Sequence, residues 1–183
     1  MPKVLVGVTG GIAAYKAAET TSQLVKAGLD VRVIMTPAAT RFVAPLTFAA
    51  LTRQKVPTSL FPDFSDGTPD VIYPHLYPAS EADAFAVLPA TADAIAKLAH
   101  GFADDLVCCS ALALKPDCKR LFCPAMNARM WAQPVVRQNA RRLLETGWHR
   151  IGPEYGTLAC GSVGLGRMTS PTAIAQIILN SVL

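Results

Sequence analysis

The segment VLVGVTGGIAAYKAAETTSQLVKAG, residues 4–28, contains a complete strand–turn–helix unit. Val4–Val8 is a short apolar run rich in β-branched residues, which is typical of a buried strand. Thr9-Gly10-Gly11 then provides a turn, and the alanine-rich stretch from Ile12 to Ala27 predicts a helix that Gly28 ends. The segment therefore predicts the opening half of a βαβ unit.

Further strand candidates follow at intervals that leave room for helices. They are Val31–Met35, Ala84–Leu88 and Arg120–Cys123. The final segment, Pro171–Leu183, predicts a closing helix with Thr169 or Ser170 as its cap. This alternation predicts an α/β, single-domain Rossmann-like (flavodoxin-like) three-layer fold, in which a mostly parallel sheet carries helices on both faces. We expect the domain to cover residues 1–183, with a loop at Phe61–Tyr73.

The composition is that of a folded chain with few surface charges. Hydrophobic residues make up 51% of the 183 residues and charged residues 16%, with a formal net charge of +4. This balance excludes a disordered chain, and no apolar run is long enough to cross a bilayer. The basic residues around Pro134–Thr146 form too weak a stripe for nucleic-acid binding and predict a solvated helix face. We therefore expect the apolar surplus in the core and in contacts between subunits.

The cysteines and the N-terminus bear on the cellular compartment. No C-x-x-C pair occurs, so no zinc or other metal site is expected. Cys108, Cys109 and Cys123 lie in apolar stretches and are interpreted as small buried hydrophobic residues. The N-terminus lacks a signal-peptide pattern. We therefore expect a cytoplasmic protein without a disulfide framework.

Small and hydroxylated residues follow each predicted strand. Since ligands of such folds sit at the carboxyl ends of the strands, these junctions are the candidate binding residues. They are Thr9-Gly10-Gly11, Thr36-Pro37-Ala38, Pro89–Asp93 and Pro124–Asn127. The glycine turn does not match G-x-G-x-x-G, and no acidic residue follows Met35, so NAD is disfavoured. Thr36 could hold a phosphate, while Thr91 fits either a ligand contact or an ordinary helix cap.

Three further features carry candidate chemistry. His75 follows the predicted loop, and residues 124–131, PAMNARMW, follow a strand. Residues 158–168, LACGSVGLGRM, form a glycine-spaced loop that could close over a ligand as a flap. Taken singly, His75 could be an ordinary surface histidine and Cys160 a passive thiol in a turn. His100 and His149 lack comparable surroundings.

Together these stretches resemble the homo-oligomeric flavin-containing cysteine decarboxylase superfamily, and within it the phosphopantothenoylcysteine decarboxylase family. The similarity runs from about Lys3 to Ser170 and includes His75, the element Pro89–Ala94, the element Pro124–Trp131 and the flap Ala159–Met168. The resemblance implies FMN, held by Gly10, Gly11, Ile12, Thr36, Ala38, Phe42, Thr91, Ala92, Asp93, Ala94 and Ala125. It also implies His75 and Cys160 as catalytic residues, with Asn127, Met130, Gly161 and Arg167 at the substrate.

The sequence departs from the family pattern at two places. Asp93 and Ala94 stand where the family element often has Asn and Thr, which puts the flavin contacts there in doubt. Leu76-Tyr77-Pro78, after His75, and Glu81, where many relatives have Trp, are also atypical. None of these changes falls on His75, Asn127 or Cys160.

The resemblance further implies a reaction and partners. The reaction is the FMN-dependent decarboxylation of 4′-phosphopantothenoylcysteine to 4′-phosphopantetheine in coenzyme A biosynthesis, by thiol oxidation, CO2 loss and re-reduction of the ene-thiol. The expected assembly is a homotrimer or dodecamer with active sites between subunits, served by a separate phosphopantothenate–cysteine ligase. The alternatives are a peptidyl-cysteine decarboxylase, a flavin prenyltransferase, and a non-catalytic flavin-binding regulatory subunit.

Overall fold

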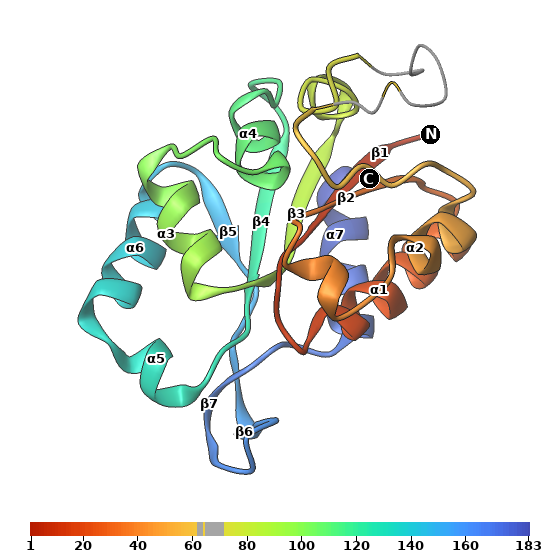
Figure 1. The fold of residues 1–183 in the computed structure, drawn as a ribbon. Coiled ribbons are helices and arrows are strands. Elements are labelled where there is room, and N and C mark those ends of the chain that lie inside the picture. The colour runs from red at the N-terminus through yellow and green to blue at the C-terminus, as the bar shows by residue number, and fades with distance from the viewer. Residues whose placement is uncertain (62–63, 65–71) are drawn as a thin grey trace.

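The computed structural model describes residues 1–61, 64 and 72–183, and it contains a five-stranded parallel sheet (Figure 1). The strands are β1 (Lys3–Val8), β2 (Asp30–Met35), β3 (Ala84–Ala90), β4 (Lys119–Pro124) and β5 (Trp148–Arg150). Their spatial order is β2-β1-β3-β4-β5, and every neighbouring pair is parallel. This order is that of flavodoxin-like folds, in which the strand order reverses between β1 and β3. The predicted α/β fold with a mostly parallel sheet is therefore confirmed.

Helices cover both faces of this sheet and make three layers. Figure 1 shows α1 (Ala14–Lys26), α2 (Pro45–Thr52) and α7 (Pro171–Val182) on one face. The other face carries α3 (Ala92–His100), α4 (Leu106–Leu112), α5 (Ala128–Ala132) and α6 (Pro134–Glu145). Two short 3-10 turns, η1 (Ala39–Arg41) and η2 (Ala79–Glu81), lie in the connections. Within the described ranges, no helix combines the length and the apolar character that a membrane span requires.

The alternation of side chains along the strands builds two cores. Val4, Val6 and Val8 of β1 point toward α1 and α7, whereas Leu5 points toward the α3–α6 layer. All seven residues of β3 are buried, as expected for a central strand with helices on both faces. The closing helix begins at Pro171, and Ser170 rather than Thr169 caps it, because the Ser170 Oγ accepts from the Ala173 N–H at 3.3 Å.

Two predictions need correction. The segment that contains residues 158–168 is not only a loop, since it belongs to an antiparallel hairpin of β6 (Glu154–Thr157) and β7 (Val163–Arg167). The short strand β5 was not among the predicted strands. The predicted loop Phe61–Tyr73 falls mostly on residues 62–63 and 65–71, outside the described residues.

Candidate functional site

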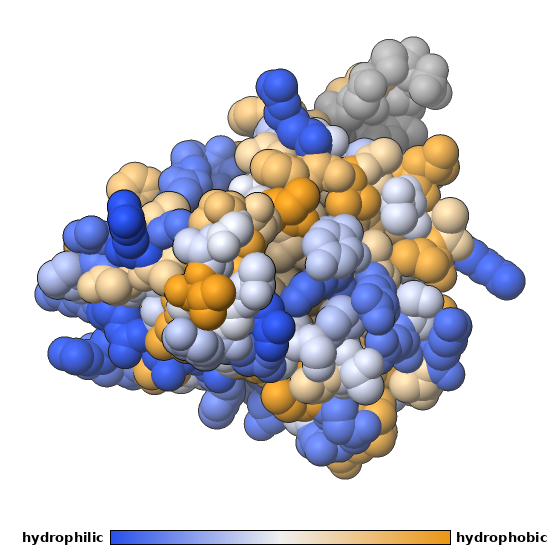
Figure 2. All heavy atoms as spheres, turned by 90° about the horizontal axis from the view of Figure 1, so that it is seen from below, coloured by the Kyte–Doolittle hydropathy of each residue, from blue (hydrophilic) through white to orange (hydrophobic). Residues whose placement is uncertain are grey.

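The carboxyl ends of four strands meet at one edge of the sheet and bring the small-residue junctions together. Val8 pairs with Met35, and Ala90 pairs with Pro124, so these strands end at similar positions along the strand direction and the segments that follow them start close together. The buried Thr9 ties two of them, because its Oγ1 donates to the Pro89 carbonyl at 2.6 Å. Figure 2, which looks onto this edge, shows hydrophobic side chains interspersed with hydrophilic ones.

Packing within the chain requires a glycine at position 10 but not at position 11. A Cβ on Gly10 would lie 2.5 Å from the Ala38 Cβ, so the close approach of the two junctions explains that glycine. A Cβ on Gly11 would meet only the Thr91 Cγ2 and Pro89 Cγ, at the ordinary distances of 3.6 and 3.7 Å. Packing within the chain therefore does not require a glycine at this position, and Gly11 lines a cavity through which a ligand could approach the backbone at the start of α1.

The hydroxyl and carboxylate side chains at this edge are engaged in local contacts. The Thr36 Oγ1 accepts from the Ala39 N–H at 3.2 Å. The Thr91 Oγ1 accepts from the Ala94 N–H at 3.1 Å and caps α3, so the helix-cap interpretation of Thr91 has direct geometry behind it. Each hydroxyl still has its own hydrogen to donate to a ligand. Asp93 is exposed and lies 3.4 Å from the Lys97 ammonium, where it supports the helix.

Glycines allow the hairpin to pack closely against the loop that follows β4. A Cβ on Gly166 would lie 2.2 Å from the Met126 carbonyl oxygen, and one on Gly164 would lie 2.7 Å from the Ala128 Cβ. The Met126 N–H donates to the Gly166 carbonyl at 3.0 Å. No larger residue fits at Gly166 without moving backbone. The glycine spacing of this segment therefore serves close packing as well as the turn between the two strands.

This packing brings Cys160, at the tip of the hairpin, to Asn127. The Asn127 Nδ2 donates to the Cys160 Sγ at 3.2 Å, and the Ser162 Oγ lies 3.1 Å from the same sulfur. Hydrogen bonds from Ser162, from its side chain first and its backbone second, and then from Asn127 lower the pKa of the exposed Cys160 thiol to about 7. Burial instead raises the pKa of Cys118 to about 11. Cys160 is therefore set apart as a thiol that ionises near neutral pH.

A cavity of about 440 Å³ connects the hairpin with the end of β1. Six predicted site residues line it: Gly11, Ile12, Ala125, Asn127, Cys160 and Arg167. Two cations also line it, Lys16 of α1 and Arg167 of β7. Burial first, and then the Arg167 charge, lower the pKa of Lys16. Arg167 is paired with Glu154 at 3.0 Å, and Met130 is half-exposed on α5, outside the residues that line the cavity.

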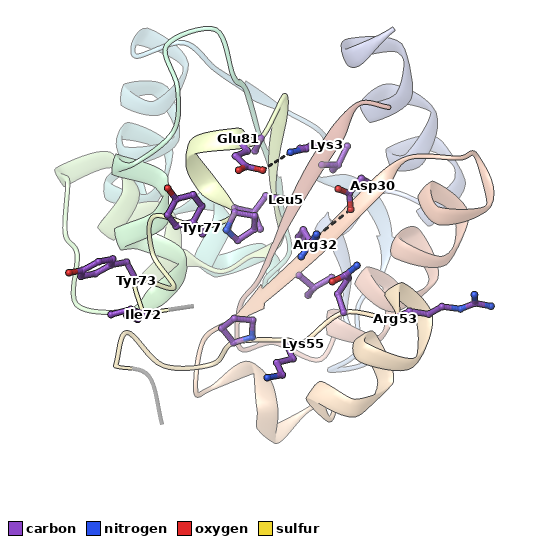
Figure 3. Close-up of a pocket in the computed structure, with 16 residues that line it drawn as sticks. Lys3, Leu5, Asp30, Arg32, Arg53, Lys55, Ile72, Tyr73, Tyr77 and Glu81 are labelled. Carbon is purple, nitrogen blue, oxygen red and sulfur yellow. Dashed lines mark hydrogen bonds and ion pairs between the residues drawn. The ribbon is translucent and has the colours of Figure 1, made fainter. Parts of the chain in front are cut away.

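His75 lies elsewhere in the same chain. Its ring makes an edge contact with Tyr73, with 6.3 Å between the centroids. Tyr73 and Tyr77 line a separate pocket of about 790 Å³ together with Lys3 and Leu5 at the start of β1 (Figure 3). Figure 1 shows segment 72–81 at the amino edge of the sheet and the β6–β7 hairpin at the carboxyl edge. A single chain therefore does not bring His75 to Cys160.

The sequence analysis did not single out two residues of this site, Lys16 and Ser162, and it named Thr9 only as part of the turn that follows β1. Thr9 links the ends of β1 and β3, and the Lys16 Nζ donates to the Met168 carbonyl at 2.9 Å, which joins α1 to the end of the hairpin. Ser162 contacts the thiol directly. Ser162 could have been noticed from its position two residues after Cys160, whereas the partners of Thr9 and Lys16 lie 80 and 152 residues away along the chain.

Comparison with known proteins gives consistent matches. The model of the Flavoprotein family matches residues 1–183. The probable phosphopantothenoylcysteine decarboxylase of Streptococcus mutans serotype c is 42% identical over 176 residues, which are 96% of each chain. The coenzyme A biosynthesis bifunctional protein CoaBC of Bacillus subtilis is 46% identical over 174 residues, and this chain spans only 41% of its length.

Two solved structures share the fold over nearly the whole chain. A mutant PPC decarboxylase complexed with pantothenoylaminoethenethiol has a TM-score of 0.84 at 26% identity, covering 98% of this chain and 97% of that one. The FMN-dependent cysteine decarboxylase SpaF has a TM-score of 0.79 at 27% identity, covering 100% and 98%.

Proposed function

Because this chain belongs to the Flavoprotein family, we propose that it is an FMN-dependent enzyme that decarboxylates 4′-phosphopantothenoylcysteine to 4′-phosphopantetheine in coenzyme A biosynthesis. Its 42% identity with a full-length probable phosphopantothenoylcysteine decarboxylase supports this substrate. The observation that carries the proposal is the contact of Asn127 Nδ2 with Cys160 Sγ, at 3.2 Å, in a cavity that reaches the end of β1. The domain would cover residues 1–183.

The carboxyl edge of the sheet fits a flavin mononucleotide. Gly11, which lines the cavity, lies next to the start of α1, whose N-cap residue Ala13 has no side chain that could satisfy the helix N–H groups. Such a terminus favours a phosphate. The hydroxyls of Thr36 and Thr91 could each donate one hydrogen bond, and the half-exposed Phe42 and Ile12 offer apolar contact to a ring. Ala38, Ala92, Asp93, Ala94 and Ala125 would complete this site.

The reaction needs an electron sink that the substrate lacks. The carbanion formed by loss of CO2 from an amide-linked cysteine cannot be stabilised by the neighbouring nitrogen. Bound FMN would supply reversible two-electron redox chemistry, which provides the electron sink that the substrate lacks. The overall reaction is therefore redox-neutral, and the protein side chains have to bind the substrate and move protons.

Asn127 is proposed to orient the substrate carboxylate. Its Oδ1 already accepts from the Arg129 N–H at 2.8 Å, so the Nδ2 is the end that remains for a carboxylate or for Cys160. A neutral amide holds the carboxylate without a positive charge that would favour the ionised ground state over neutral CO2. Lys16 and Arg167 line the same cavity but are already bonded to the Met168 carbonyl and to Glu154.

Cys160 is proposed to give the proton needed when the ene-thiol is reduced to the saturated thiol. An acid with a pKa of about 7 can donate at neutral pH and regain its proton from solvent. The thiol is exposed at the tip of the hairpin, which allows this exchange. Gly161 and Arg167 of the hairpin, together with Met130 of α5, are proposed to contact the substrate.

His75 is proposed to act in the active site of a neighbouring copy. Segment 72–81, which contains His75, lies at the opposite edge of the sheet from the hairpin, and this supports a site shared between two chains. Exposed apolar side chains at the carboxyl edge, including Ile12, Phe42 and Leu46, would be covered in such an assembly. We expect a homotrimer or a dodecamer built from trimers. A separate phosphopantothenate–cysteine ligase would supply the substrate.

The direct test of the function is a CO2 assay. The purified, flavin-loaded protein is expected to release CO2 from 4′-phosphopantothenoylcysteine and to form 4′-phosphopantetheine in equal amount. A peptide that ends in cysteine is the competing substrate, and faster CO2 release from that peptide would overturn the assignment in favour of a peptidyl-cysteine decarboxylase. A flavin-loaded protein that releases CO2 from neither substrate would contradict decarboxylase activity altogether.

A further inference from the structure

We propose that Ser162 is a positioning residue that directs the Cys160 thiol and holds its thiolate form in place. The inference rests on the proposed function of Cys160 as an acid, and it assigns a role to a residue that the predicted site did not include. The Ser162 Oγ lies 3.1 Å from the Cys160 Sγ, in the turn between β6 and β7.

The turn is built to keep the two side chains together. The Leu158 N–H donates to the Ser162 carbonyl at 2.8 Å, and the Gly161 N–H donates to the Leu158 carbonyl at 2.9 Å. Gly161 has a φ of +82°, a left-handed conformation that favours glycine and allows the tight turn. Cys160 and Ser162 therefore face the same side of a closed turn before any substrate binds.

The two neighbours of the sulfur differ in their hydrogen-bonding capacity. An amide nitrogen can only donate, so Asn127 Nδ2 can bind the sulfur lone pairs but cannot take the thiol hydrogen. A hydroxyl can both donate and accept. Ser162 can therefore accept from the S–H group of the thiol and donate to the thiolate. It is the neighbour that can hydrogen-bond Cys160 both before and after the thiol gives up its proton.

The charged groups near the thiol do not replace this contact. Lys16 of α1 and Arg167 of β7 line the same cavity, Glu154 of β6 is paired with Arg167, and Tyr15 of α1 is a further titratable group there. The pKa of Cys160 is lowered chiefly by hydrogen bonds from Ser162 and Asn127 and not by these charges, and the Ser162 side chain is the largest cause. Removal of the hydroxyl should therefore make the thiolate less stable.

The test is the pH dependence of Cys160 alkylation by iodoacetamide in the flavin-loaded protein, read by mass spectrometry of the Cys160 peptide. Ser162→Ala is expected to raise the pH midpoint of alkylation by about one unit, and hence to slow alkylation at pH 6 about tenfold, because a hydrogen bond to a charged group is lost. Ser162→Thr keeps the hydroxyl and should restore the wild-type midpoint. Ser22→Ala, in α1 and outside the residues that line the cavity, is the matched control and should leave it unchanged.

The same shift is expected in turnover. Because the thiol form acts as the acid, the rate of 4′-phosphopantetheine formation should fall above the Cys160 pKa, and this alkaline limb should move to higher pH in Ser162→Ala. An alkylation midpoint that Ser162→Ala leaves unchanged would overturn the inference. So would a Ser162→Thr variant that behaves like Ser162→Ala. Alkylation needs no substrate, so a protein that releases no CO2 would contradict the proposed function separately.

Discussion

Replacement of Cys160 by serine is expected to stop the reaction after CO2 has left. A serine hydroxyl is a far weaker acid than a thiol with a pKa of about 7, so protonation of the ene-thiol should fail while earlier steps continue. The product should then be two hydrogens lighter than 4′-phosphopantetheine. We expect formation of the normal product to fall by roughly 10²–10⁴-fold, the usual contribution of a positioned general acid.

Mass spectrometry of the product, together with a CO2 assay, measures both halves of this expectation. Cys109→Ser is the matched control, because Cys109 is a half-buried thiol on α4 and does not line the cavity. It should give normal product at the normal rate. Normal product from Cys160→Ser would remove Cys160 from the proposed mechanism.

Two inactive variants are expected to rescue each other if the site is shared between chains. His75→Asn should lose CO2 release, and Cys160→Ser should lose the normal product. In randomly mixed oligomers, a site that takes Cys160 from one chain and His75 from another is intact in about a quarter of cases. Co-expression of the two variants should therefore recover about a quarter of the wild-type rate of 4′-phosphopantetheine formation.

The double variant His75→Asn/Cys160→Ser, mixed equally with wild-type chains, separates the two arrangements. Shared sites predict that about a quarter remain active in that mixture, whereas sites contained in one chain predict about half. A mixture of the two single variants that forms no 4′-phosphopantetheine, combined with half activity in the second mixture, would show that His75 and Cys160 act within the same chain.

The residues that could be predicted from the sequence are those with local or periodic signals. The four long strands, α1 and α7 were all predicted, since each has an apolar run with a clear turn or cap beside it. The strand β5 has only three residues, and two of them, His149 and Arg150, are exposed. It therefore carries no alternating pattern, and it is a strand because its backbone pairs with β4.

The hairpin and the separation of the site residues depend on long-range packing. Glycines at 164 and 166 suggest a loop in sequence, but here they let β7 lie against Met126 and Ala128. The chain order places His75 before β3 and Cys160 after β6, and nothing in that order says that the two lie at opposite edges of the sheet. The contact of Asn127 with Cys160 likewise spans 33 residues and follows from the folded hairpin.

The central claim is that decarboxylation requires a transient two-electron oxidation of the substrate, for which a bound flavin would be the electron acceptor. Its most direct test is the visible absorbance of the flavin-loaded protein after anaerobic mixing with 4′-phosphopantothenoylcysteine. We expect the absorbance of the oxidised flavin to fall and then recover in the wild-type protein, and to fall without recovery in Cys160→Ser. Release of CO2 with no change in flavin absorbance in Cys160→Ser would contradict the claim.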